Sequence, residues 1–111
     1  MDNVDLDKVY ILRLTFYEVG NVIWKESYLH KKVRDPVRTA EVFEEIMKGF
    51  RVLEDPPIHS VLKIAVEKGL TYYDASYVYS SEVNGLTLVS EDKELITKTN
   101  AIPLKEFLKE V

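Results

Sequence analysis

The apolar positions of the chain alternate between short continuous runs and helical repeats, the pattern of a sheet whose strands are connected by helices. The short runs are rich in β-branched, aromatic or leucine side chains and end at polar or turn-forming residues. They predict strands at 9–12, 50–53, 86–89 and 101–104, the last at an edge because Pro103 cannot donate to a central ladder. Because helical patterns separate the runs, we expect an α/β fold with a mostly parallel sheet and flanking helices.

Capping signals locate the ends of the predicted helices. Thr15 followed by Glu18, and Thr71 followed by Asp74, each have the spacing of an N-terminal capping box with the acid at position N3. Asp35-Pro36 joins a favoured N-cap to a favoured first helical residue. We therefore expect helices from residue 16 onward and at 36–48, 57–68, 72–83, 93–98 and 105–111.

Length and composition narrow the class of protein. A chain of 111 residues, 46% of them hydrophobic, is expected to form one domain over residues 1–111. The net charge of -4 argues against nucleic-acid binding by bulk positive charge, but a local basic patch or a metal ion can still attract phosphates. The chain has no cysteine, which excludes disulfides and thiolate sites. Its start, MDNVDLDK, is unlike a signal peptide and no apolar run reaches about 20 residues, so we expect a cytoplasmic protein without a membrane segment.

Three acids, Glu18, Asp74 and Asp92, each lie where a strand or loop is predicted to meet a helix. Carboxylates are the ligands that Mg²⁺ or Mn²⁺ prefers, often together with substrate phosphates. Such an ion can generate a hydroxide nucleophile and stabilise charge during phosphodiester hydrolysis, which is metal-dependent nuclease chemistry. Helix capping is the alternative role for all three, because acids near helix N-termini are stabilised there.

Other candidate residues support fewer functions. Glu91 and Glu94 flank Asp92 and are either substitute ligands or solvated charges. His30 and His59 lack metal-ligand spacing and receive no role. The chain has no G-x-S-x-G elbow and no Gly-rich phosphate loop, so a serine hydrolase and a dinucleotide-binding protein are not expected.

Aromatic and basic residues leave a further choice open. The basic segment from Lys25 to Arg38 is either a solvated helix end or a surface that attracts phosphates. The aromatic residues favour packing in a core or an interface, with stacking on RNA bases as the alternative. They are Tyr17, Trp24, Tyr28, Tyr72, Tyr73, Tyr77 and Tyr79.

Two stretches, TFYEVGNVIWK at 15–25 and LTYYDASYVYSSEVNGLTLVSEDKEL at 70–95, resemble the PIN-domain family in order and spacing. The resemblance covers most of the chain and implies a small α/β protein with a parallel sheet. It further implies an Mg²⁺- or Mn²⁺-dependent ribonuclease toxin, typically a homodimer, that is paired with an antitoxin protein. Residue by residue, it assigns Glu18, Asp74 and Asp92 to the metal and catalytic set. Asn21 matches the E-x-x-N pattern and Ser90 the usual Ser or Thr position, and with Lys25 they are the expected substrate contacts.

The chain departs from the family at its start, where members open with a strand that carries an Asp. Asp2, Asp5 and Asp7 lie in a polar stretch that is not such a strand. We therefore expect an N-terminally shortened PIN-like domain whose activity is reduced or absent. Two rival hypotheses are a noncatalytic module for dimerisation or antitoxin binding, and a fragment without a cooperative core.

Overall fold

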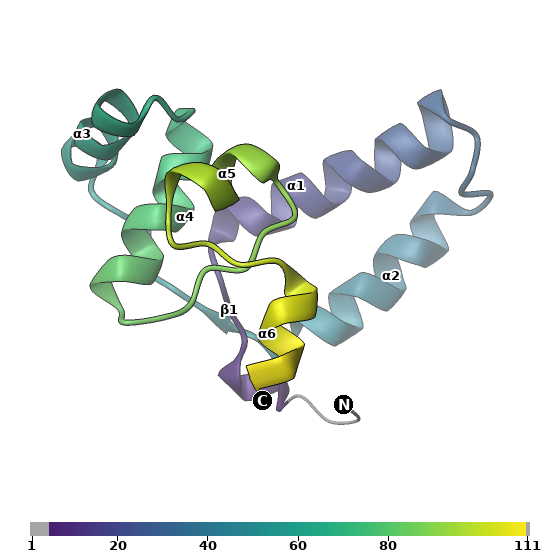
Figure 1. Ribbon diagram of the computed structural model, residues 1–111. Coiled ribbons are helices and arrows are strands. Elements are labelled where there is room, and N and C mark those ends of the chain that lie inside the picture. Colours follow the sequence, from purple (N-terminus) through teal and green to yellow (C-terminus); the bar gives the residue numbers. More distant parts are fainter. Residues whose placement is uncertain (1–4, 111) are drawn as a thin grey trace. The chain divides into compact units, whose positions relative to one another are not determined.

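The computed structural model describes residues 5–110, which divide into two compact units (Figure 1). We call residues 5–54 the N-terminal unit and the described residues 55–110 the C-terminal unit. Asp2 lies outside the described residues. The expectation of one domain over the whole chain stays a prediction, and the Val78→Ala variant tests it.

A parallel strand pair opens the N-terminal unit. A short 3-10 helix, η1 (Leu6–Lys8), precedes β1 (Tyr10–Ile11), which pairs in parallel with β2 (Arg51–Val52). The N–H of Arg51 donates to the carbonyl of Val9 at 2.9 Å, and the N–H of Leu53 donates to that of Ile11 at 2.8 Å. The parallel pairing is as predicted, although each strand is shorter than the apolar run that predicted it.

Two helical segments complete the N-terminal unit. The helix α1 (Arg13–Trp24) continues into η2 (Lys25–Leu29), a π-helical turn in which the N–H of His30 donates to the carbonyl of Lys25. The second helix, α2 (Pro36–Met47), contacts α1. The predicted N-cap is confirmed, because the Asp35 carboxylate accepts a hydrogen bond from the N–H of Arg38 at 3.0 Å.

The predicted capping box of Thr15 and Glu18 is wrong. α1 begins at Arg13, three residues earlier than expected, so Thr15 occupies position N3. Its hydroxyl accepts a hydrogen bond from the N–H of Leu12 at 3.2 Å, which is the contact that a Glu or Gln makes in a capping box. Glu18 therefore lies beyond the first turn of α1, is exposed, and does not cap the helix.

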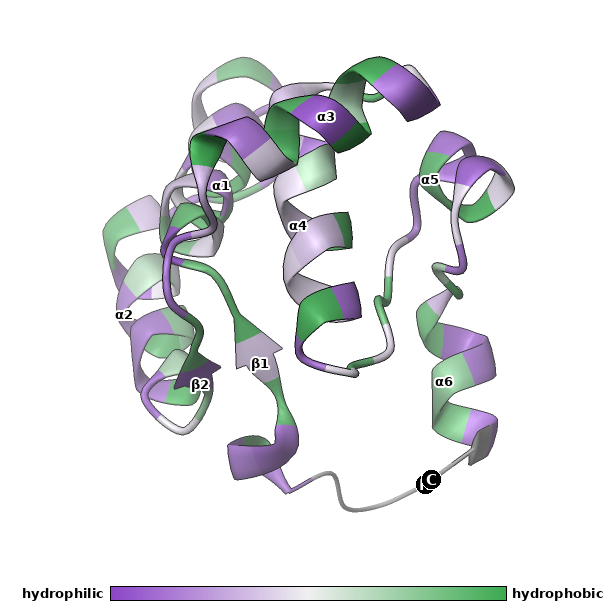
Figure 2. Cartoon of the chain, turned by 90° about the vertical axis from the view of Figure 1, so that its left-hand side faces the viewer, coloured by the Kyte–Doolittle hydropathy of each residue, from purple (hydrophilic) through white to green (hydrophobic). Residues whose placement is uncertain are grey.

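The C-terminal unit is built on two packed helices, α3 (Ile58–Lys68) and α4 (Tyr72–Val83). Polar and apolar residues alternate around α3, as expected for a helix with one buried face (Figure 2). Gly69 ends α3 with a φ of 65°, the left-handed conformation that glycine adopts most readily. The buried core cluster of this unit consists of Val61, Ala65, Leu70, Ala75, Val78, Leu95 and Ala101.

The last part of the C-terminal unit contains a single parallel bridge and two short helices. Val89 is bridged to Ile102, with the N–H of Ser90 donating to the carbonyl of Ile102 at 3.0 Å. The predicted strands at 86–89 and 101–104 are thus reduced to this bridge. The helix α5 (Lys93–Lys98) has the predicted bounds and α6 (Leu104–Glu110) begins one residue early, while Val111 is outside the described residues. No helix within residues 5–110 is long and apolar enough to cross a membrane.

Val78→Ala tests both the core and the expectation of a single domain. Val78 is 1% exposed, so losing its two methyl groups should lower the free energy of unfolding by about 2 kcal/mol. If the chain is one cooperative domain, the substitution should lower the urea midpoint equally by two probes. These are the fluorescence of Trp24, which lies in the N-terminal unit, and the circular dichroism signal.

The matched control is Val66→Ala, because Val66 lies on α3 and is 80% exposed. It should change the free energy of unfolding by no more than about 0.5 kcal/mol. A Trp24 transition that stays in place in Val78→Ala, while the circular dichroism transition moves, would show that the units unfold independently.

Two glycine substitutions should change stability in opposite directions. Gly20 lies inside α1, and an added Cβ would meet no heavy atom within 4 Å, so Gly20→Ala should stabilise by about 0.5–1 kcal/mol. Gly69→Ala should destabilise by about 1 kcal/mol or more, because its φ of 65° is unfavourable for a residue with a Cβ. Thermal melts of both variants beside the unaltered chain measure the effects, and a stabilised Gly69→Ala would contradict the left-handed cap.

Candidate functional site

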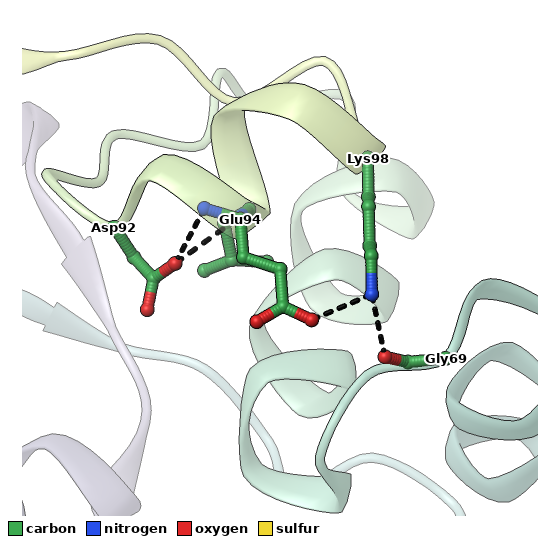
Figure 3. A network of polar contacts seen from close by, with 5 residues as sticks. Gly69, Asp92, Glu94 and Lys98 are labelled. Atoms are coloured by element: carbon green, nitrogen blue, oxygen red, sulfur yellow. Dashed lines mark hydrogen bonds and ion pairs between the residues drawn. The ribbon is translucent and has the colours of Figure 1, made fainter.

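Asp92 is the N-cap of α5 and uses one carboxylate oxygen for that purpose (Figure 3). Its Oδ1 accepts hydrogen bonds from the N–H groups of Glu94, at 2.8 Å, and Leu95, at 3.2 Å. Within the described part of the chain, Oδ2 has no hydrogen-bond or ion-pair partner, and the residue is exposed. The predicted capping role is thus confirmed, and the second oxygen remains available for another ligand.

The loop before Asp92 is held by Ser90. The hydroxyl oxygen of Ser90 accepts a hydrogen bond from the N–H of Asp92 at 3.0 Å. The N–H of Ser90 donates to the carbonyl of Ile102 in the parallel bridge. Hydrogen bonds therefore hold both Ser90 and Asp92 in the segment that leads into α5. In this arrangement the Ser90 hydroxyl acts as an acceptor toward the chain and keeps its own proton to donate.

The two acids beside Asp92 have structural partners. Oε1 of Glu91 accepts a hydrogen bond from the N–H of Leu104, at the start of α6, at 3.0 Å. Oε1 of Glu94 contacts Nζ of Lys98, which also donates to the carbonyl of Gly69 at 2.9 Å (Figure 3). These contacts account for Glu91 and Glu94 without a metal ion and leave Asp92 as the strongest ligand candidate in this loop.

Asp74 lies in the first turn of α4. The hydroxyl of Thr71 accepts a hydrogen bond from the N–H of Asp74 at 3.1 Å, which confirms Thr71 as the N-cap. The Asp74 side chain is half-buried and lies close to the positive end of the helix dipole. The C-terminal unit therefore contributes two candidate ligands, Asp74 and Asp92, each from a helix N-terminus.

The remaining predicted site residues of the N-terminal unit lie along one continuous helical segment. Glu18, Asn21 and Lys25 are all exposed, and their spacing places them on one face of α1 and η2. Within residues 5–110, no three acidic or histidine side chains form a group that could hold a metal ion. A site built from Glu18, Asp74 and Asp92 thus stays a prediction.

Sequence reasoning missed one feature of the N-terminal unit. The rings of Trp24 and Tyr28 stack with their centroids 5.6 Å apart and their planes 12° apart, and Nζ of Lys31 lies 5.0 Å from the centroid of the Tyr28 ring. The i, i+4 spacing of two aromatic residues beside a basic run was the available signal. Periodicity alone did not reveal that both rings are exposed.

Comparisons with known proteins agree with this architecture. The PIN-domain family model matches residues 2–100. Exonuclease VapC9 of Pyrobaculum aerophilum is 48% identical over 103 residues, which are 92% of this chain and 76% of that protein. Ribonuclease VapC3 of the same organism is 31% identical over 99 residues, 86% of this chain and 74% of that protein.

A solved structure extends the likeness to three dimensions. The crystal structure of PAE2754 from Pyrobaculum aerophilum superposes with a TM-score of 0.86 at 46% sequence identity, covering 93% of this chain and 76% of that one. The resemblance of residues 15–25 and 70–95 to the family is confirmed, as is the expected PIN-like α/β fold. On the family model, the relatives and the shared fold together, this chain belongs to the PIN-domain family.

Proposed function

We propose that this chain is the ribonuclease toxin of a toxin-antitoxin pair and hydrolyses RNA phosphodiester bonds with the help of Mg²⁺ or Mn²⁺. The observation that carries the proposal is the divided use of the Asp92 carboxylate, with Oδ1 on α5 and Oδ2 without a partner in the described residues. Membership of the PIN family, and relatives named as an exonuclease and a ribonuclease, support the reaction class. The cytoplasm is the compartment that we propose for it.

The residues that would hold the ion are Asp92, Asp74 and Glu18. Mg²⁺ commonly takes one or two protein carboxylates and completes its shell with water and substrate phosphates, so a tight group of three acids is not required. The donor set here is all oxygen, as these ions prefer. When bound, such an ion supplies activated water and stabilises the negative charge that develops on the phosphodiester.

The proposed substrate contacts are Asn21, Lys25 and Ser90. Asn21 and Lys25 share the exposed face of Glu18, and their amide and ammonium groups can donate to phosphate oxygens. The Ser90 hydroxyl keeps a proton to donate, since its oxygen is the acceptor for the N–H of Asp92. Each of these groups can donate to the RNA backbone.

Protein partners would bind the apolar stripe of α2, which we define as Val42, Phe43 and Ile46. These side chains are 43–47% exposed and share one face of α2, and contiguous exposed apolar surface marks interaction sites. We propose that the stripe contacts either a second copy, in a homodimer, or an amphipathic helix of an antitoxin. The same stripe would serve the alternative function, a noncatalytic dimerisation or antitoxin-binding module.

Cleavage of a labelled single-stranded RNA with Mn²⁺, with and without EDTA, tests the enzyme proposal. Asp92→Asn should lower the rate by about 100-fold or more, since changing even a residue behind the metal ligands costs about 10- to 100-fold. Asn caps helices as well as Asp does, so this variant should keep its melting temperature. Asp74→Asn and Glu18→Gln should lower the rate similarly.

The matched control is Glu91→Gln, which removes a charge from the residue next to Asp92 but keeps an oxygen to accept from the N–H of Leu104. Its cleavage rate should stay within about threefold of the unaltered chain, a difference below 1 kcal/mol. Cleavage that persists in EDTA, or that is indifferent to Asp92→Asn, would sink the metal-dependent ribonuclease and leave the noncatalytic module.

A further inference from the structure

Two large aromatic rings lie exposed where α1 passes into η2. Trp24 is 48% exposed and Tyr28 is 63% exposed, although they stack on each other in a nearly parallel arrangement. Large aromatic side chains are mostly buried in folded proteins, and Trp in particular has a high average burial. The π-helical turn that carries Tyr28 is itself rare and occurs frequently at functional sites.

Lys31 is held in an unfavourable conformation beside these rings. Its φ of 57° makes it the one non-glycine residue with positive φ among residues 5–110. The turn around it is fixed because the carbonyl of Glu26 accepts hydrogen bonds from the N–H groups of Lys32 and Val33. A glycine would adopt this φ more readily, yet the position is occupied by a Lys whose ammonium lies over the Tyr28 ring.

Unpaired positive charge follows the rings closely in the sequence. Lys32 and Arg34 are exposed and form no ion pair within the described residues. Residues 25–38 hold five Lys or Arg residues against two acids, Glu26 and Asp35. In a chain of net charge -4, this is a local concentration of positive charge.

We propose that the rings and these cations form an accessory binding site for single-stranded RNA, built without the acids proposed for cleavage. A base stacks on the Trp24–Tyr28 pair while the cations contact the flanking phosphates. We call this the aromatic-cationic cluster, and it consists of Trp24, Tyr28, Lys31, Lys32 and Arg34. That the strand is RNA rests on the proposed function; the stacking and phosphate contacts follow from the cluster itself.

The chemistry of the cluster favours a nucleic acid over a protein partner. The cores of protein interfaces are depleted of charged residues, and Lys is disfavoured there. The apolar stripe of α2 has the composition of a protein contact, with no cation among Val42, Phe43 and Ile46. Exposed π-faces interleaved with unpaired cations are instead the combination used by proteins that bind single strands.

Trp24 is the one tryptophan of the chain, so its fluorescence reports on the cluster directly. We would titrate the full chain with a single-stranded oligoribonucleotide in EDTA, where metal-dependent cleavage is prevented. Saturable quenching of Trp24 is expected as a base stacks on it. Affinity should fall as salt rises, with a slope in log K against log[salt] of about −0.7 for each phosphate contacted.

Variants distinguish an effect on RNA binding from an effect on folding. RNA affinity is measured by the fluorescence anisotropy of a labelled RNA, and folding by the melting temperature. Trp24→Ala should weaken binding by between about 5-fold and 150-fold, and Trp24→Phe by less, since it keeps a ring. Lys31→Gly should weaken binding while leaving the melting temperature unchanged or raised, because it removes the strained side chain. Lys63→Ala, an exposed Lys on α3, is the matched loss of charge and should leave affinity unchanged.

The outcomes distinguish this site from the proposed enzyme. Unchanged RNA affinity in Trp24→Ala and Lys31→Gly would overturn the accessory site, even where Asp92→Asn abolishes cleavage and so upholds the ribonuclease. Weakened binding in both variants would support the site, even where no RNA is cleaved. If light scattering showed that these two variants change the oligomeric state while their RNA affinity is unchanged, the cluster would be a protein contact. That result would also overturn the proposal.

Discussion

The carboxylate of Asp92 is the contact on which the candidate site depends. The first N–H groups of a helix have no partner inside it, and Oδ1 of Asp92 satisfies those of Glu94 and Leu95. The cap fixes α5, which places Leu95 in the buried core and Lys98 against the carbonyl of Gly69. Because Oδ1 makes both capping bonds, Oδ2 is left without a partner among the described residues.

Structural and chemical roles for the acids are therefore not exclusive, and the structure separates them residue by residue. Glu91 and Glu94 have partners that explain them fully as parts of the fold. Asp92 caps a helix and keeps a second oxygen. Glu18 does not cap α1, because the helix begins too early, and it lies exposed on the face of Asn21 and Lys25.

The N-terminal unit presents surfaces of contrasting chemistry on its helices. The stripe of α2 is aliphatic and aromatic, so its removal from water would favour association with another apolar surface. The aromatic-cationic cluster combines rings with unpaired ammonium and guanidinium groups, whose burial against protein would cost desolvation energy. Phosphates supply the opposite charge while bases supply the stacking partner, so the two surfaces fit different partners.

Signals that act over a few residues were readable from the sequence alone. The bounds of α4 and α5 could be predicted because Thr71 and Asp92 cap the helices that follow them directly. The PIN-family motifs could likewise be read from short stretches of sequence. The start of α1 did not, because a Thr hydroxyl fits either N-cap or N3, and the observed conformation uses N3. Periodicity likewise groups side chains onto faces without showing which face is covered. Only the tertiary structure decided the exposure of Trp24, because exposure depends on which elements pack against a helix face. It also decided the strained backbone of Lys31, because the positive φ arises where the chain turns between α1 and α2.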